Sequence, residues 1–197
     1  MPPKVLLLAV IGFMLLSQSC ALSPQSVVLR PTLDVSIPAL SQTQTVALKV
    51  LDLRATEAFG MRGGIYNTAL ITPRTDLAET LRRVLAERLQ HGNFQVIEMI
   101  EANSPPLSLE VRIKRIDYGV TSVLAGGLLN EVRVNAMFQA TARSTQNTLS
   151  GQYQATGTRQ INGYLSAQQN EALLNKVVGQ ALQSMLADQE LLAVLRG

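Results

Sequence analysis

The sequence predicts an α+β fold, a two-layer sandwich in which two amphipathic helices cover one face of a mostly antiparallel sheet. From residue 107 to residue 160, apolar and polar residues alternate in successive segments, which is typical of antiparallel strands with one face in water. Residues 77–89 and 166–188 instead repeat apolar residues at three- and four-residue spacing, which indicates helices. A chain of 197 residues is long enough to bury the core of one such domain.

The chain begins with the features of an export signal. Residues 5–16, VLLLAVIGFMLL, form an uninterrupted apolar run directly after Lys4. The run is too short to span a bilayer, which takes about 20 residues, but it has the length of a signal-peptide core. We therefore expect residues 1–19 to be a signal peptide.

Two sites of signal cleavage are possible. The stretch LLSQSC resembles a bacterial lipoprotein box, which predicts cleavage between Ser19 and Cys20 and lipid on the cysteine. It departs from the usual pattern at Ser17, where such boxes prefer leucine. The alternative is ordinary cleavage after the small residues Ser19 and Ala21, which would release a soluble periplasmic protein.

Cys20 is the only cysteine of the chain, so it has no partner for an internal disulfide. Lipid attachment would give this exported thiol a role. Each buried methylene contributes about 0.8 kcal/mol, so two or more acyl chains, such as palmitate, anchor a protein stably. The resemblance to bacterial lipoproteins implies several chains on Cys20, and Ala21 in place of aspartate implies export to the outer membrane.

After the anchor, residues 20–45 are rich in Ser, Thr, Gln and Pro, which favours a tether. Within it, Leu33, Val35 and Ile37 alternate with polar residues, as in an edge strand. We expect the single α+β domain to occupy residues 46–197. Its first elements are a strand at 45–54, a turn-rich loop at 57–64 and a short strand at 65–72.

The clearest helix follows. Asp76 is a helix-start residue, Gly92 is a stop, and Glu79 and Arg83 are spaced to form an ion pair on the polar face. Strands are then expected at 94–100, 107–120, 131–144 and 149–160, before the closing helix. In the second of these, the alternation changes phase near Lys114 and Arg115, which predicts a β-bulge.

The chain resembles the YajG family of bacterial lipoproteins. The resemblance rests on Cys20, the strand TVALKVLDLR, the segment LITPRTDLAETLRRVLAERLQHGNF, the strands EVRVNAMFQATARS and GQYQATGTRQ, and the closing helix with LLNKVVGQALQSML. It covers nearly the whole mature chain, departs mainly at LAGGLL, and implies an envelope lipoprotein whose molecular function is not established.

Residues suited to catalysis or metal binding are few. His91 is the only histidine and is expected at a helix end, so neither a histidine-dependent triad nor a His/Cys metal site is predicted. Glu98 and Glu101 would lie on opposite faces of a strand, which does not suit a catalytic pair. Gly60 to Gly64, GMRGG, lacks the ending of a phosphate loop. We expect no enzyme activity, no cofactor and no metal.

Two apolar segments are candidate interaction sites. The predicted hairpin tip contains Leu124, Leu128 and Leu129, which would form a patch for a partner or membrane if exposed and core if folded back. The C-terminal leucines of ELLAVLRG favour core packing.

The function that the sequence predicts is binding. A net charge of +3 and the absence of tryptophan argue against a nucleic-acid partner. We expect a lipid-anchored protein on the periplasmic side of the outer membrane that binds an unknown envelope protein partner, as an accessory factor of an assembly or cell-wall machine. The alternative is a periplasmic binder of a small envelope-derived ligand, a lipid or a muropeptide.

Overall fold

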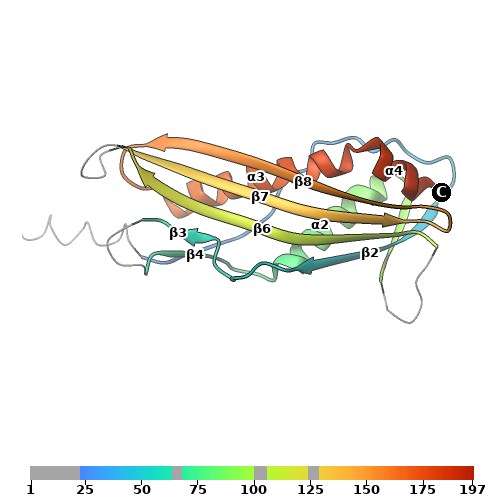
Figure 1. The fold of residues 1–197 in the computed structure, drawn as a ribbon, viewed down its shortest axis with the longest axis horizontal. Coiled ribbons are helices and arrows are strands. Elements are labelled where there is room, and N and C mark those ends of the chain that lie inside the picture. The colour runs from blue at the N-terminus through green and yellow to red at the C-terminus, as the bar shows by residue number, and fades with distance from the viewer. Residues whose placement is uncertain (1–22, 64–67, 100–105, 124–128) are drawn as a thin grey trace, which may run out of the picture.

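A computed structural model describes residues 23–63, 68–99, 106–123 and 129–197 (Figure 1). The signal peptide, the Ser19 and Cys20 site, Glu101, Leu124 and Leu128 lie outside these residues. The strands are β1 (Gln25–Val27), β2 (Gln44–Asp52), β3 (Gly60–Met61), β4 (Leu70–Pro73), β5 (Phe94–Glu98), β6 (Ser108–Ser122), β7 (Asn130–Arg143) and β8 (Thr148–Ile161). The helices are α2 (Leu77–His91), α3 (Ala167–Leu186) and α4 (Gln189–Arg196).

Strand β6 organises the sheet. One edge of β6 pairs with β7 along its whole length, and β7 pairs with β8, so these three long strands form an antiparallel meander. The other edge of β6 is shared between two parallel neighbours, with β2 opposite residues 108–113 and β3 opposite Tyr118. β5 extends the sheet beyond β2, while β4 and β1 extend it beyond β3.

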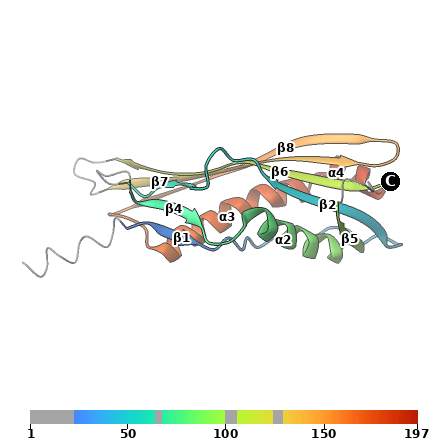
Figure 2. The same cartoon turned by 90° about the horizontal axis from the view of Figure 1, so that it is seen from below.

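The predicted meander is confirmed, but the sheet as a whole is mixed. Among the described strands, β1 with β4, β2 with β5, β2 with β6, and β3 with β6 are parallel pairs. For β2 and β5 the reason is the connection through α2, since a helical crossover returns the chain beside β2 in the same direction. The sheet also curls, so that β1 and β4 approach the layer of α3 (Figure 2).

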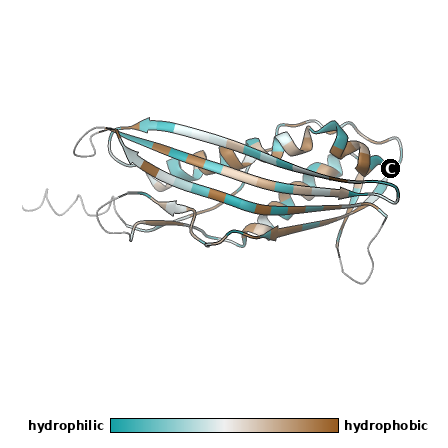
Figure 3. Cartoon of the chain, in the orientation of Figure 1, coloured by the Kyte–Doolittle hydropathy of each residue, from teal (hydrophilic) through white to brown (hydrophobic). Residues whose placement is uncertain are grey.

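The predicted bulge is confirmed. The register between β6 and β7 shifts between Ile113 and Arg115, which leaves Lys114 as the extra residue. On both sides of the shift the buried side chains point the same way, with Val111 and Ile113 before it and Ile116 and Tyr118 after it. Figure 3 shows the resulting alternation of hydrophobic and hydrophilic residues along β6 and β7.

All three helices lie on one side of the β6–β8 meander (Figures 1 and 2). α2 begins as predicted, because the Asp76 carboxylate accepts a hydrogen bond from the backbone N–H of Glu79, and it ends at Gly92. α3 begins with a capping box between Ser166 and Gln169. The residues after the closing helix, expected only as an apolar segment, form a further helix, α4.

The strap, as we name residues 28–40, leads from β1 toward β2 without forming a strand, and at Leu40 its N–H donates to the carbonyl of Gly92 at the end of α2. The predicted alternation is real, since Leu33 and Ile37 are buried and Val35 is half-buried, while Asp34 and Ser36 are exposed. The edge-strand interpretation is wrong, because none of these residues belongs to a strand, and the backbone of Val28 and Arg30 is bound by side chains of α3. The stretch expected to be a tether therefore already packs into the core from Val27 onward.

Candidate functional site

A hollow of the described surface lies between the strap and α2. It encloses about 460 Å³ and is open to solvent on one side. We call it the strap groove. It is lined by the strap residues Val28, Leu29, Arg30, Pro31, Thr32 and Leu33 and by Thr75, Thr80, Arg83, Val84, Glu87, Arg88 and His91. A volume of this size is within the range of about 300 to 1,000 Å³ for ligand sites.

The strap wall is held in place by polar side chains at four-residue spacing on α3. The Glu171 carboxylate accepts from the N–H of Val28 at 2.9 Å. Asn175 is bound twice, since its oxygen accepts from the N–H of Arg30 and its nitrogen donates to the carbonyl of Val28. Because residues four apart lie on one face of a helix, α3 presents a row of hydrogen-bonding side chains to the backbone of the extended strap.

Gly179 belongs to the same row and allows the strap to approach α3 closely. A Cβ atom at this position would lie 2.9 Å from the carbonyl oxygen of Thr32. One turn further, Gln183 donates to that same carbonyl at 3.5 Å. The strap wall is thus fixed by α3, while its other side faces the groove.

The wall formed by α2 carries most of the charge. Arg83, Glu87, Arg88 and His91 lie on successive turns of this helix and line the groove. Arg83 is largely exposed and lies 3.9 Å from Glu79. With Arg30 from the strap, the groove lining contains three arginines, one glutamate and His91.

Arg88 is the least satisfied of these cations. Among the described residues, its Nε atom is buried and has no hydrogen-bond partner. By contrast Arg82, on the same helix but outside the groove, donates two hydrogen bonds to Glu79 at 2.7 and 2.8 Å. A buried guanidinium nitrogen without an acceptor costs free energy.

A second polar site lies at the end of the molecule where the described chain begins. Arg62 is only 4% exposed and donates to the carbonyls of Ser23 and Leu165. The Gln25 amide lies 3.0 Å from both terminal nitrogens of Arg62, and with its oxygen turned toward them it accepts from the guanidinium. Burial lowers the pKa of Arg62, and nearby tyrosine hydroxyls oppose that effect.

Tyr118 and Asn170 continue this site into the core. The Tyr118 hydroxyl is 2.7 Å from the Asn170 oxygen, and the amides of Asn170 and Gln25 are 2.7 Å apart. Burial raises the pKa of Tyr118 to about 12, so the hydroxyl is neutral at physiological pH. The cluster is saturated by its own members, which marks it as structural.

The residues singled out from the sequence are placed as follows. His91 is the last residue of α2, as expected, and it also lines the strap groove. Glu98 is exposed on β5. Leu129 is half-buried, and its carbonyl accepts from the N–H of Val123. The C-terminal leucines are buried in the core through α4, which confirms core packing: Leu191, Leu192 and Leu195.

GMRGG is not a loop but contains β3. Gly60 has φ of +153°, and a Cβ atom there would lie 1.8 Å from the carbonyl oxygen of Tyr118. The glycine is needed because β3 approaches β6 at this point. Arg62, two residues after Gly60, is the buried cation described above. No sequence pattern distinguishes it from the exposed arginines.

The strap groove was not predicted as a site. Its cations come from two segments, Arg30 on the strap and Arg83 and Arg88 on α2, and their proximity depends on how the strap crosses the helices. In the described ranges no group of three His, Cys, Asp or Glu side chains could hold a metal. Within the same ranges no helix is long and apolar enough to cross a membrane.

Comparison with known proteins identifies a family. The model of a family described as uncharacterized lipoprotein matches residues 31–196. No curated protein matches the sequence.

Solved structures resemble the chain only remotely. Protein XCC0632 from Xanthomonas campestris is 14% identical with a TM-score of 0.48, over 89% of this chain and 96% of that one. A minor lipoprotein from Acinetobacter baumannii is 14% identical with a TM-score of 0.37, over 76% and 90%. PelC from Paraburkholderia phytofirmans, solved as a dodecamer, is 15% identical with a TM-score of 0.36, over 76% and 93%. With TM-scores below 0.5, these likenesses identify neither the fold nor the activity of the chain.

Proposed function

Since the chain belongs to a bacterial family of uncharacterized lipoproteins, we propose that lipid on Cys20 anchors it to the outer membrane, where its domain binds a partner in the periplasm. The proposed activity is binding and not catalysis. The resemblance of the sequence to the YajG family agrees with an envelope role and is part of the same proposal.

The observation that carries the proposal is the fixation of the chain at Ser23. Its carbonyl accepts from the buried Arg62, which also holds Leu165 at the start of α3. Ser23 is the third residue after Cys20, a reach of about 10 Å when fully extended. A lipid on Cys20 would therefore hold this end of the domain close to the bilayer.

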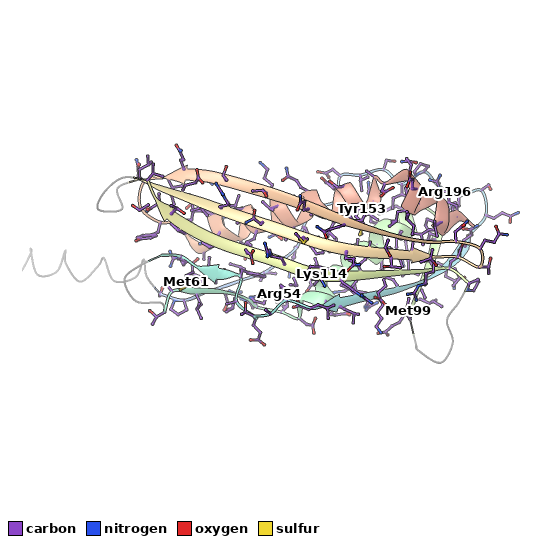
Figure 4. The ribbon with its side chains drawn as sticks, viewed as in Figure 1. Arg54, Met61, Met99, Lys114, Tyr153 and Arg196 are labelled. Carbon is purple, nitrogen blue, oxygen red and sulfur yellow. The ribbon has the colours of Figure 1, made fainter. Side chains whose placement is uncertain are left out.

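This orientation gives the two ends of the molecule different surroundings. Met61, near the anchored end, and Arg196, near the other, lie at opposite ends of the long axis (Figure 4). Leu129, the described residue of the predicted tip patch, lies at the anchored end. The neighbouring Asn130 donates a hydrogen bond to the carbonyl of Gly163, two residues before Leu165, which Arg62 binds. We propose that Leu129, together with Val123, which is 49% exposed, contacts the membrane surface there.

The face of the meander that turns away from the helices, which we call the open face, is the surface where we propose that a protein partner binds. Lys114 of β6 lies on it (Figure 4). Its charges are paired along the strands, as in Arg115 with Asp117 at 3.2 Å and Arg133 with Glu131 at 3.0 Å. A broad polar face with fixed charges suits the accessory role, in which the protein recognises a component of an envelope assembly or cell-wall machine.

The anchor is tested by Cys20→Ser. We expect the variant to lose labelling by a palmitate analogue and to leave the membrane fraction. Ser17→Leu, which restores the usual lipoprotein box, is the matched control and should retain both. A Cys20→Ser protein that stays in the membrane pool would refute the anchor.

The partner is tested by placing a photo-crosslinking residue at Gln154, which is exposed on the open face, or at Gln180, which is exposed on α3. We expect Gln154 alone to give an adduct with one envelope protein, identified by mass spectrometry. Equal adducts from both positions would contradict binding through the open face. If no protein is captured while lipid or muropeptide copurifies, the accessory role is wrong and the small-ligand alternative, which the strap groove supports, replaces it.

A further inference from the structure

We propose that the strap groove binds an anionic ligand that combines a phosphate group with a short apolar portion. The inference names the ligand class of the small-ligand alternative and in that sense rests on the proposed binding function. It concerns only described residues, those of the strap wall and of the facing side of α2.

The charge of the lining fits a phosphate. Arg30, Arg83 and Arg88 contribute three positive charges and Glu87 one negative charge, which leaves a net charge of two before His91 is counted. A phosphate monoester carries about 1.5 to 2 negative charges at pH 7, whereas a carboxylate carries one. Guanidinium groups also bind phosphate oxygens through paired N–H donors, and three of them can share one phosphate.

The donor in the groove is already without a competing acceptor. The buried Nε of Arg88 has no partner among the described residues, while Arg82, six residues earlier on α2, donates two hydrogen bonds to Glu79. The Arg88 side chain lines the groove, so a phosphate oxygen there would not have to displace a carboxylate, as it would at Arg82.

Part of the remaining lining is apolar. Val28, Leu29, Pro31 and Leu33 come from the strap and Val84 from α2. A free phosphate ion would leave the half-buried Val28 and Val84 facing water, whereas an ester with a short alkyl or sugar-lipid portion would cover them and gain about 25 cal/mol for each Å². The volume of about 460 Å³ exceeds the needs of a bare phosphate.

The strap wall is rigid enough to present this surface. Val28 and Arg30 are bound through their backbone to Glu171 and Asn175 on α3, so the groove is held open from behind. Preformed sites lose less conformational entropy when a ligand binds. The ligand thus meets a groove whose shape is set by contacts outside it.

The test uses the full-length lipidated protein in a nonionic detergent and isothermal titration calorimetry. The probes are hexyl phosphate, which has both features, inorganic phosphate, which has only the charge, and hexanol, which has only the apolar chain. We expect hexyl phosphate to bind at least tenfold more tightly than either single-feature probe. We also expect its affinity to fall as salt is raised.

A matched pair of variants places the binding. Arg88→Gln removes a groove cation and Arg82→Gln removes the same charge from the same helix outside the groove. We expect Arg88→Gln to weaken hexyl phosphate at least tenfold and Arg82→Gln less than threefold, with thermal unfolding showing that both variants fold. Equal weakening by the two variants, or equal binding of hexyl phosphate and hexanol, would overturn the assignment.

Two sources of such a ligand are separated by a further probe, dihexanoyl phosphatidic acid, whose headgroup is itself a phosphate monoester. If this lipid binds more tightly than hexyl phosphate, the source of the ligand is a lipid headgroup. If it binds more weakly, the source is a soluble phosphate ester. Either result supports a phosphate in the groove. If no phosphate probe binds while Cys20→Ser still loses the membrane pool, the ligand assignment is wrong and the anchored role stands. If hexyl phosphate binds while Cys20→Ser keeps its membrane pool, the anchor is wrong and the groove stands.

Discussion

The hydroxyl of Tyr153 on β8 donates a hydrogen bond of 2.5 Å to Oδ2 of Asp188, the residue that caps α4. The other carboxylate oxygen of Asp188 accepts from the backbone N–H groups of Glu190 and Leu191. One aspartate thus starts the last helix and ties it to the outermost strand of the meander. Figure 4 shows Tyr153 between β8 and the helical layer.

We expect Tyr153→Phe to lower the free energy of unfolding by about 1.5 kcal/mol, the lower end for hydrogen bonds to charged groups, because Asp188 remains accessible to water. Denaturant unfolding measures the loss. The control is Tyr164→Phe at a tyrosine that is 38% exposed, which should change stability by less than about 0.5 kcal/mol. An unchanged Tyr153→Phe protein would show that the hydrogen bond stabilises nothing.

The same contact predicts an acid dependence. The hydrogen bond from Tyr153, followed by those from the backbone of Leu191 and Glu190, holds the pKa of Asp188 below its ordinary value against a smaller opposing effect of burial. A lowered pKa means that the stabilisation is complete above the unfolded pKa of about 3.9 and is lost as pH falls through the folded pKa. The stability difference between the native protein and Tyr153→Phe should therefore shrink below about pH 4, measured by urea unfolding across pH. A difference that grows there would contradict the assignment.

Adding one methyl group at Gly60 should lower the stability of the fold strongly. Because its Cβ would lie 1.8 Å from the Tyr118 carbonyl oxygen at a φ of +153°, Gly60→Ala should destabilise the fold by about 3 kcal/mol or more. The matched control is Gly119, the residue after Tyr118 on β6, because a Cβ atom added there meets nothing within 4 Å. Gly119→Ala should be neutral or stabilising by up to about 1 kcal/mol. Thermal unfolding of the two variants separates the outcomes, and similar midpoints would show that β3 does not approach β6 as described.

Asn175 predicts a local effect on the strap. Asn175→Ala removes the acceptor of the Arg30 N–H and the donor to the Val28 carbonyl, so we expect amide exchange at Arg30 to speed up at least tenfold. Hydrogen exchange followed by mass spectrometry or NMR measures this. Gln180→Ala on the same helix is the control and should leave exchange at Arg30 unchanged. Exchange that stays slow in Asn175→Ala would mean that the strap is held by its buried leucines alone.

The parts of the fold that local patterns encode were predictable. The α2 helix has Asp76 at its start and Gly92 at its end, and the bulge at Lys114 follows from a change of phase that any alternating strand must show when one residue is inserted. The buried faces of β7 and α3 are periodic in the same way. These features depend on neighbours within a few residues, which a sequence displays directly.

The parts that depend on distant partners were not predictable. The strap has the alternation of a strand, yet its backbone is satisfied by Asn175 and Glu171 on a helix, so periodicity alone indicated the wrong element. Direction in the sheet was missed for the same reason, since β2 and β6 are parallel only because of how the intervening chain crosses over. The groove combines both problems, because Arg30 and Arg88 meet only once strap and helix are placed.

The strap also determines when folding can be completed. Its backbone partners on α3 lie 143 to 151 residues further along the chain, so these hydrogen bonds cannot form until nearly the whole chain is available. Contacts of such long sequence separation form slowly, because the loop-closure entropy is spent before they form. The strap, although it comes near the start of the domain, is therefore among the last segments to reach its final position.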